Sequence, residues 1–319
     1  MFSLERRFQG LHASHLNPLP HNETCHSPFH PTPSMKPLQG IRILSLALNL
    51  PGPAAMMRLK ALGANCRKLE PPGGDPMQMY AGTAYAHMHQ GIRMILADLK
   101  TDTGQAKLAK ELAQADVLLT SFRASALKRL GLSWPKLRKA YPKLSMVSIV
   151  GDVHAPEVAG HDLTYMAECG LIPSQALPSS LFADMGGSLV AVQAVLCAVL
   201  KQRESGRGCF QEVGLAQAAQ YLALPHQWGL TRPEGLIGGA HALYQVFACA
   251  DGRVALAALE PHFSQRVCKL VGWPDFKAAD ALSPALKRKV AAFMKRRSCA
   301  ELQALGEDLD LPLHVMRDA

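Results

Sequence analysis

Short runs of apolar residues alternate, between residues 41 and 150, with longer segments in which apolar side chains recur every three or four positions. The short runs have the length and composition of buried strands, and the longer segments have the period of amphipathic helices. Strands that alternate with such helices predict a parallel sheet with helices on both faces. The expected strands are Ile41–Leu46, Cys66–Glu70, Arg93–Leu96, Asp116–Thr120 and Leu144–Val150.

Proline, glycine and capping residues mark the ends of the expected helices. One helix is expected at Ala54–Leu62, and Asp102 or Thr103 is expected to cap another that ends at Leu112. The later elements of this part of the chain are helix Ala126–Arg138, helix Ser188–Arg203, strand Phe210–Gly214 and helix Leu215–Leu224.

A second pattern begins near Ala240. Ala250-Asp251-Gly252 joins two strand-like runs, Tyr244–Cys249 and Arg253–Leu259, and is a strong hairpin signal. Helices are expected to start at Pro261 and Ser283, and a capping box at Ser298–Glu301 starts a third that ends at Gly306. Leu311–Met316 is expected to be a closing strand.

These patterns predict an α/β protein with a Rossmann-like parallel-sheet domain and a small α+β domain. The predicted division is a large domain over 36–225, a linker over 226–240, a small domain over 241–305 and a C-terminal segment over 306–319. Residues 1–35 hold several histidines and prolines without periodicity, so we expect a disordered leader. A transit segment is the alternative interpretation of 1–35, and it would direct the protein to an organelle.

Composition narrows the class of partner. The chain has 319 residues, a formal net charge of +9 and an aromatic content of 6%. A basic surplus favours an anionic partner, but no run alternates basic with aromatic residues as a single-strand nucleic-acid binder would. The longest apolar run, Leu189–Leu200, is shorter than the roughly 18 residues that span a bilayer. We therefore expect a phosphate-bearing small molecule, with neither nucleic acid nor a membrane span.

Neither of the common nucleotide motifs is present. No Gly-x-Gly-x-x-Gly follows the first expected strand, and no Gly-x-x-x-x-Gly-Lys-Ser/Thr occurs anywhere in the chain. Basic residues at strand ends and loops are the alternative phosphate ligands, although a solvated basic face explains them as well. They are Arg67, Lys68, Lys100, Arg123, Lys128 and Arg129.

The eight cysteines form no Cys-x-x-Cys pair. This is the pattern of reduced thiols in a cytosol-like compartment, so we expect a cytoplasmic protein without structural disulfides. Cys25 lies near three histidines, but their spacing matches no zinc pattern, and no metal site is expected.

Three residues carry candidate chemistry. Asp184 precedes Gly186-Gly187, so it is either a helix cap or a carboxylate beside backbone N–H groups that can hold an oxyanion. His161 follows a glycine and can move protons near neutral pH, although most histidines have no catalytic role. Glu260 ends an apolar strand, where a solvated carboxylate is common.

A series of short motifs, each weak alone, resembles the family III CoA transferases of the CaiB/BaiF type in its order and spacing. Within that family the His161 and Glu260 motifs resemble the α-methylacyl-CoA racemases. The motifs are Leu50-Pro-Gly-Pro-Ala-Ala, Glu70-Pro-Pro-Gly-Gly-Asp75, Ala97-Asp-Leu-Lys100, Gly160-His-Asp-Leu-Thr-Tyr165, Ala183-Asp-Met-Gly-Gly187, Cys249-Ala-Asp-Gly252 and Leu259-Glu-Pro-His-Phe263.

The resemblance implies a reaction at the 2-methyl centre of a branched acyl-CoA. His161 would exchange a proton on one face of the α-carbon and Asp184 on the other, while Glu260 would orient His161 or carry its proton. The enolate oxygen would lie near the backbone N–H groups of Asp184–Gly186. The family's CoA ligands match Ala97, Leu99, Lys100, Arg123, Arg129 and Asp162.

The resemblance also implies an interlocked homodimer, whose site combines large and small domains of different subunits, and no cofactor beyond the CoA moiety of the substrate. Two alternatives stay open. In a CoA transferase Asp184 would attack the thioester as a nucleophile. A weakly active homologue would only bind CoA esters. One departure affects CoA binding: Ala124-Ser125 stands where the family has Pro-Gly.

Overall fold

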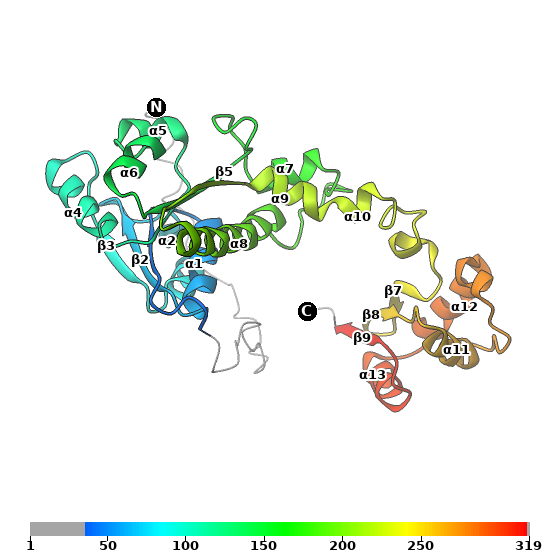
Figure 1. Ribbon diagram of the computed structural model, residues 1–319. Coiled ribbons are helices and arrows are strands. Elements are labelled where there is room, and N and C mark those ends of the chain that lie inside the picture. The colour runs from blue at the N-terminus through cyan, green and yellow to red at the C-terminus, as the bar shows by residue number, and fades with distance from the viewer. Residues whose placement is uncertain (1–35, 318–319) are drawn as a thin grey trace, which may run out of the picture.

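The computed structural model describes residues 36–317, so the expected leader lies outside the described residues. Figure 1 shows a larger unit built on one sheet and a smaller unit that ends with the C-terminal strand. The larger sheet has six strands and the smaller sheet has three.

The larger sheet is parallel throughout, with the order β3-β2-β1-β4-β5-β6. This is the doubly wound order in which the direction of winding reverses between β1 and β4. The predicted Rossmann-like α/β fold is therefore confirmed. The strands are β1 (Arg42–Ser45), β2 (Asn65–Glu70), β3 (Arg93–Leu96), β4 (Val117–Thr120), β5 (Ser145–Val150) and β6 (Phe210–Gly214).

Helices cover both faces of this sheet because alternate residues of its central strands point to opposite sides. Ile43 packs in a core with α1 and α8, whereas its neighbour Leu44 packs in a second core with α4, α5 and α6. The helices of the larger unit are α1 (Pro51–Ala61), α2 (Met77–Tyr80), α3 (Gly82–Met88), α4 (Asp102–Leu112), α5 (Ala124–Arg129), α6 (Trp134–Ala140), α7 (Asp162–Glu168), α8 (Phe182–Ser205), α9 (Leu215–Leu222) and α10 (Leu224–Gln227).

Two local predictions in this unit are wrong. The single helix expected at Ala126–Arg138 is two helices, α5 and α6, because Gly131 between them has a left-handed φ of 75°. Helix α4 is capped by Thr101, not by Asp102 or Thr103, since the Thr101 hydroxyl accepts from the Gly104 N–H at 3.1 Å.

Helix α8 begins six residues earlier than the expected Ser188, at Phe182, and passes through Gly186-Gly187 without a break. A Cβ on Gly187 would lie 2.3 Å from Leu215 Cδ2, so this glycine permits close packing of α8 on α9. Helix α8 is long and apolar enough to cross a membrane, but 50% of its apolar window is buried in the fold. Its contacts with α1, α9 and the sheet are those of a core helix.

The smaller unit is an antiparallel sheet packed against helices around its own core. The predicted β7–β8 hairpin and the closing strand β9 are both present. The capping box is also confirmed, since the Ser298 hydroxyl accepts from the Glu301 N–H at 3.2 Å. Its helix α13 continues past Gly306, where we expected it to end. The elements are η1 (Leu236–Ala240), β7 (Tyr244–Cys249), β8 (Gly252–Ala257), α11 (Pro261–Leu270), η2 (Ala278–Leu282), α12 (Pro284–Lys295), α13 (Cys299–Asp308) and β9 (Leu313–Arg317).

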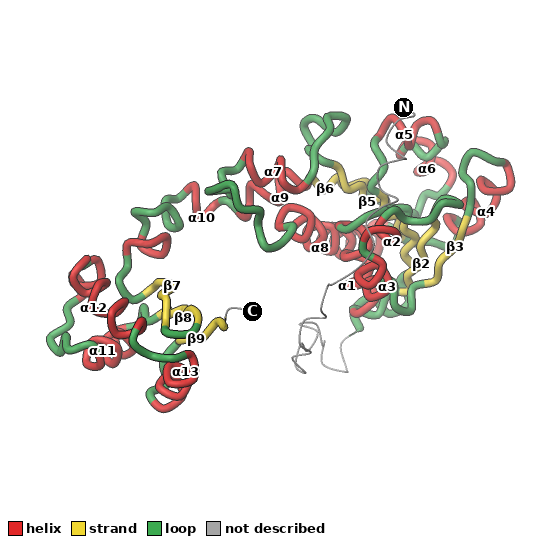
Figure 2. Tube along the Cα trace, turned by 180° about the vertical axis from the view of Figure 1, so that it is seen from behind, coloured by secondary structure: helices red, strands yellow, loops and turns green. Residues whose placement is uncertain are grey.

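The connection between the units runs through α10 and η1. Figures 1 and 2, which view the molecule from opposite sides, both show the smaller unit standing apart from the larger sheet at the end of this connection. A residue of the small unit therefore does not lie beside the carboxyl edge of the larger sheet in the same chain.

Candidate active site

A cavity of about 200 Å³ opens at the point where the winding of the larger sheet reverses. The loops after β1 and β4 diverge there, and ligands of doubly wound sheets bind in the resulting crevice. Loops after β5 and β6 complete the walls. The lining residues include Asn49, Pro51, Ser121, Arg123, Gly151, Gly160, His161, Tyr165, Asp184 and Leu215.

The structure brings three of the predicted site residues together in this cavity: Arg123, His161 and Asp184. They come from the loop after β4, the start of α7 and the first turn of α8. Glu260 lies elsewhere, exposed at the start of α11 in the smaller unit. Within one chain, then, the cavity holds the carboxylate and the imidazole but not the second carboxylate.

Asp184 is the third residue of α8, so it does not cap the helix. Burial raises the pKa of its carboxyl group to about 6, with a further increase from Asp162 that His161 partly offsets. Burial outweighs the preference of a helix N-terminus for negative charge. A carboxyl group with this pKa is well matched to proton transfer near neutral pH.

Asp162 holds the start of α8 in place. Its buried carboxylate accepts the backbone N–H of Asp184 at 3.0 Å. This tie fixes the position of Asp184 relative to His161, the residue that precedes Asp162. The sequence resemblance assigned Asp162 to CoA, and this contact with Asp184 is one that the sequence did not predict.

The backbone N–H groups expected to hold an enolate oxygen already have acceptors. The Asp184 N–H donates to Asp162, and the Met185 N–H donates to the Leu181 carbonyl at 2.9 Å. This prediction is wrong because α8 starts before Asp184, which places these groups inside the helix. The residues that line the cavity and can donate hydrogen bonds include Asn49, Ser121 and Arg123.

The residues around His161 have distinct structural roles. The His161 N–H donates to the Thr164 hydroxyl at 3.0 Å, which fixes the start of α7. Tyr165 turns back over the loop that leads to His161. A Cβ on Gly160 would lie 2.5 Å from the Tyr165 ring, and one on Gly151 would lie 2.3 Å from its hydroxyl oxygen. Both positions therefore require glycine so that Tyr165 can wall the cavity.

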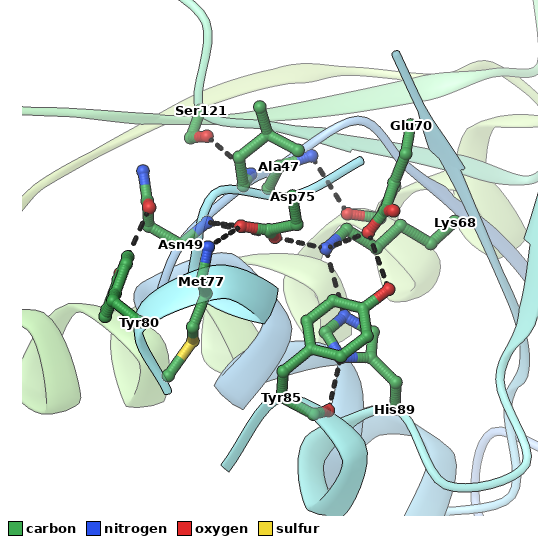
Figure 3. A network of polar contacts seen from close by, with 12 residues as sticks. Ala47, Asn49, Lys68, Glu70, Asp75, Met77, Tyr80, Tyr85, His89 and Ser121 are labelled. Carbon is green, nitrogen blue, oxygen red and sulfur yellow. Dashed lines mark hydrogen bonds and ion pairs between the residues drawn. The ribbon is translucent and has the colours of Figure 1, made fainter. Parts of the chain in front are cut away.

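Lys68 is not a phosphate ligand, contrary to one interpretation of the basic residues. Its side chain is 1% exposed and forms ion pairs with Asp75 at 2.5 Å and Glu70 at 2.9 Å. Figure 3 shows this ammonium group among Asp75, Glu70 and His89. Those three residues have the spacing of a metal-ligand set, but the Lys68 ammonium supplies the positive charge between them. Arg67 is likewise paired, with Glu111 at 2.7 Å.

The other residues assigned to CoA do not line the cavity, but they lie near the carboxyl edge of the larger sheet, where the cavity opens. Ala97, Leu99 and Lys100 form the loop after β3, and Arg129 is on α5, after β4. The carboxyl ends of parallel strands meet at one edge, so these loops share the edge of the cavity. Beside them Glu157 accepts from the Ser125 N–H and hydroxyl at 3.0 and 2.7 Å, at the position of the departure from the family pattern.

Sequence reasoning missed Asn49, Ser121 and Tyr165 as cavity residues. Asn49 has a left-handed φ of 63° and follows β1, and Ser121 directly follows β4. The available signal was their position: each comes after a buried strand, at the edge where ligands of parallel sheets bind. Tyr165 had only the spacing of its motif as a signal.

The sequence matches a known protein family. The model of CoA-transferase family III matches residues 38–319. The chain belongs to CoA-transferase family III. Its relatives include α-methylacyl-CoA racemase of Mus musculus, 28% identical over 83% of this chain and 73% of the relative. They also include succinate–glutarate CoA-transferase of Agrobacterium fabrum, 29% identical over 74% of this chain and 66% of the relative.

Solved structures show the same fold. A hypothetical protein from Mycobacterium tuberculosis superposes with a TM-score of 0.77 at 24% identity, covering 89% of this chain and 86% of that chain. A CAIB/BAIF family protein from Brucella suis superposes with a TM-score of 0.75 at 23% identity, covering 89% and 85%.

Family III members are enzymes, and their names divide between racemases and CoA transferases at nearly equal identity to this chain. Binding of an acyl-CoA thioester is consistent with membership in the family. The choice between the two reactions depends on the side chains of the cavity.

Proposed function

We propose that this protein is an acyl-CoA racemase that inverts the 2-methyl centre of a branched acyl-CoA thioester. The observation that carries the proposal is one cavity lined by two groups able to exchange protons, His161 and Asp184. Inversion needs a proton donor and acceptor on each face of the α-carbon. A carboxylate and an imidazole from different helices meet that need.

The reaction balances without a cofactor. The carboxylate or the imidazole removes the α-proton, and the electron pair of the C–H bond moves into an enolate conjugated with the thioester. The group on the opposite face then returns a proton to carbon. The Asn49 amide and the Ser121 hydroxyl line the same cavity and are the donors we assign to the enolate oxygen.

The surroundings of Asp184 suit an apolar acyl group attached to an anionic carrier. Leu181, Phe182 and Met185 are 48%, 43% and 39% exposed at the start of α8. Arg123 lines the cavity, and Lys100 and Arg129 lie exposed along the same edge of the sheet. We assign the apolar side chains to the acyl chain and the basic ones to the phosphates of CoA.

Glu260 enters this proposal only through a second copy of the chain. It is exposed in the smaller unit, which stands apart from the larger sheet in Figure 1. An interlocked homodimer would bring the smaller unit of one protomer to the cavity of the other. Glu260 would then orient His161, or carry its proton, from the partner subunit.

The alternative reaction is CoA transfer. It is favoured by the transferase names among the relatives and by the Asp184 carboxylate in the cavity. In that reaction the carboxylate attacks the thioester carbonyl, the C–S bond breaks, CoA leaves as its thiolate, and the acyl group stays on Asp184 as a mixed anhydride. This route needs an acceptor acid, whereas inversion does not.

Solvent deuterium separates the two reactions. We expect the wild-type protein in D₂O to place one deuterium at the α-carbon of (2R)- and (2S)-2-methylacyl-CoA without an acceptor acid, as measured by mass spectrometry and proton NMR. Heat-denatured protein is the control. Transfer of CoA that needs an acceptor acid, through an enzyme-bound acyl intermediate trapped by hydroxylamine and without deuterium at carbon, would establish the transferase instead. Binding of the thioester with neither reaction would indicate a homologue that only binds CoA esters.

A further inference from the structure

The buried ammonium group of Lys68 joins several polar side chains inside the larger unit. Its Nζ lies 2.5 Å from Asp75 Oδ2, 2.9 Å from Glu70 Oε1 and 3.0 Å from His89 Nε2. All four side chains are buried. Burial lowers the pKa of His89, which favours its neutral form. The Lys68 ammonium group is therefore the positive charge that the two carboxylates face.

The two carboxylates differ in what else they contact, as Figure 3 shows. Glu70 accepts from the Tyr85 hydroxyl at 3.1 Å, on α3. Asp75 accepts the Asn49 N–H with both oxygens, at 3.0 and 3.1 Å, and the Met77 N–H at 3.0 Å. Asp75 therefore ties the ammonium to the turn after β1, whereas Glu70 ties it to α3.

The turn after β1 contains a residue with an uncommon backbone conformation. Asn49 has a φ of 63°, a left-handed value that is uncommon for residues other than glycine. On its other side the Leu48 N–H donates to the Ser121 hydroxyl at 3.1 Å. A Cβ on Gly52 would lie 2.2 Å from Ala47 Cβ, so the two ends of the turn are in close contact. The turn is thus fixed between Asp75 and Ser121.

This turn reaches the cavity. Asn49, Pro51 and Ser121 line it together with Asp184. The Tyr80 hydroxyl donates to Asn49 Oδ1 at 3.2 Å, and Asp75 and Asp184 both add to the effect of burial in raising the pKa of Tyr80. The Tyr80 hydroxyl thus holds the side chain of Asn49 at the edge of the cavity.

We propose that Lys68 and Asp75 are positioning residues that hold the turn around Asn49 against the reacting end of the acyl-CoA. The inference rests on the proposed function, because it takes the cavity of His161 and Asp184 to be the place where the thioester reacts. Displacement by about 1 Å of a residue that positions the substrate can reduce the reaction rate about 10²-fold. The basic loops that we assign to CoA lie outside this turn. Displacement of the turn should therefore lower kcat and change KM little.

Asp75→Asn and Glu70→Gln form a matched pair for the test. Each replaces one buried carboxylate on the same ammonium by its amide, but Asp75 contacts the turn and Glu70 does not contact Asn49. We expect Asp75→Asn to lower kcat at least tenfold with less than a threefold change in KM. Glu70→Gln should change either constant less than threefold. Thermal unfolding of both variants shows whether their stabilities are comparable.

Amide hydrogen exchange of the peptide spanning 44–57 gives a readout that does not require turnover. We expect faster exchange in Asp75→Asn than in Glu70→Gln or the wild type. If wild-type protein does not turn over, the proposed function fails, and this exchange still decides whether Asp75 holds the turn. Equal protection of the peptide in the two variants, or equal loss of kcat, would overturn the positioning role.

A double-mutant cycle tests the route through Asn49. Asn49→Gly removes the side chain and tolerates the left-handed φ. If Asp75 acts through this turn, the loss of kcat in Asp75→Asn/Asn49→Gly is smaller than the product of the two single losses. Multiplicative losses would show that the two residues act independently and would contradict the proposal.

Discussion

Asp184→Asn is expected to reduce turnover of the acyl-CoA by about 10²–10⁴-fold, the usual contribution of a positioned acid or base. The amide has nearly the same shape as the carboxyl group but neither accepts nor returns the proton. The cavity keeps its basic and apolar surroundings, so KM should change little. Steady-state epimerisation, followed by chiral chromatography of the released acids, measures both constants.

Asp116→Asn is the matched control for this loss. Asp116 precedes β4 at the opposite, amino edge of the sheet and pairs there with Arg42 at 3.5 Å. The same chemical change should alter kcat by less than about twofold, because Asp116 lies away from the cavity. The loss of its surface ion pair should also change the stability of the fold little. An Asp184→Asn variant that keeps more than a tenth of wild-type kcat would remove Asp184 from the chemistry.

The same substitution should stabilise the fold near neutral pH. Burial raises the pKa of Asp184 from 3.8 to about 6, so the folded state binds this proton more tightly than the unfolded state does. The stability contribution of Asp184 therefore falls as pH rises from about 4 to about 6 and stays low above that range. At about 1.4 kcal/mol for each pH unit, Asn should raise the free energy of unfolding by about 3 kcal/mol at pH 7.

Urea unfolding of wild type and Asp184→Asn at a series of pH values checks this result. The difference between them should disappear below about pH 4, where the carboxyl group is protonated in both states. A difference that does not vary with pH would mean that the charge of Asp184 is not its source.

Lys68→Met should lower the free energy of unfolding by about 3–5 kcal/mol, the range for removing one partner of a buried ion pair. Methionine fills much of the lysine volume, but it leaves Glu70 and Asp75 facing each other without the ammonium group. Chemical denaturation at pH 7 measures the loss.

Lys201→Met provides the comparison at the surface. Lys201 pairs with Glu204 at 3.0 Å, but the two side chains are 58% and 73% exposed. Its loss should change stability by less than about 1 kcal/mol. Adding Asp75→Asn to Lys68→Met should recover part of the lost stability, because it removes one stranded charge. No recovery would attribute the loss to packing instead of charge.

The strands and helices of the larger sheet could be predicted from the sequence because the patterns that define them are local. Buried strands such as Val117–Thr120 are continuous apolar runs, and helical periods between them imply parallel crossovers. His161 and Asp184 were singled out by their motifs, and Arg123 as a basic residue at a strand end or loop. The structure places these three residues in the lining of one cavity.

The contacts that tune the site were not predictable from the same pattern. Lys68 at a strand end looks like a phosphate ligand until the chain folds Asp75 back onto it at 2.5 Å. Gly186-Gly187 looks like a helix start, but close packing of Gly187 on Leu215 places the pair inside α8. In each case the partner that decides the role is distant in sequence or belongs to another element.

Exchange of the α-proton in His161→Ala tests the central claim, two proton-carrying groups on opposite faces of one carbon. Each pure epimer of a 2-methylacyl-CoA is incubated with the variant in D₂O, and deuterium at the α-carbon is followed for both. We predict that exchange falls at least about 10²-fold for the epimer whose proton faces His161, that epimerisation is lost, and that the other epimer still exchanges through Asp184. Exchange at the wild-type rate from both epimers would contradict the account.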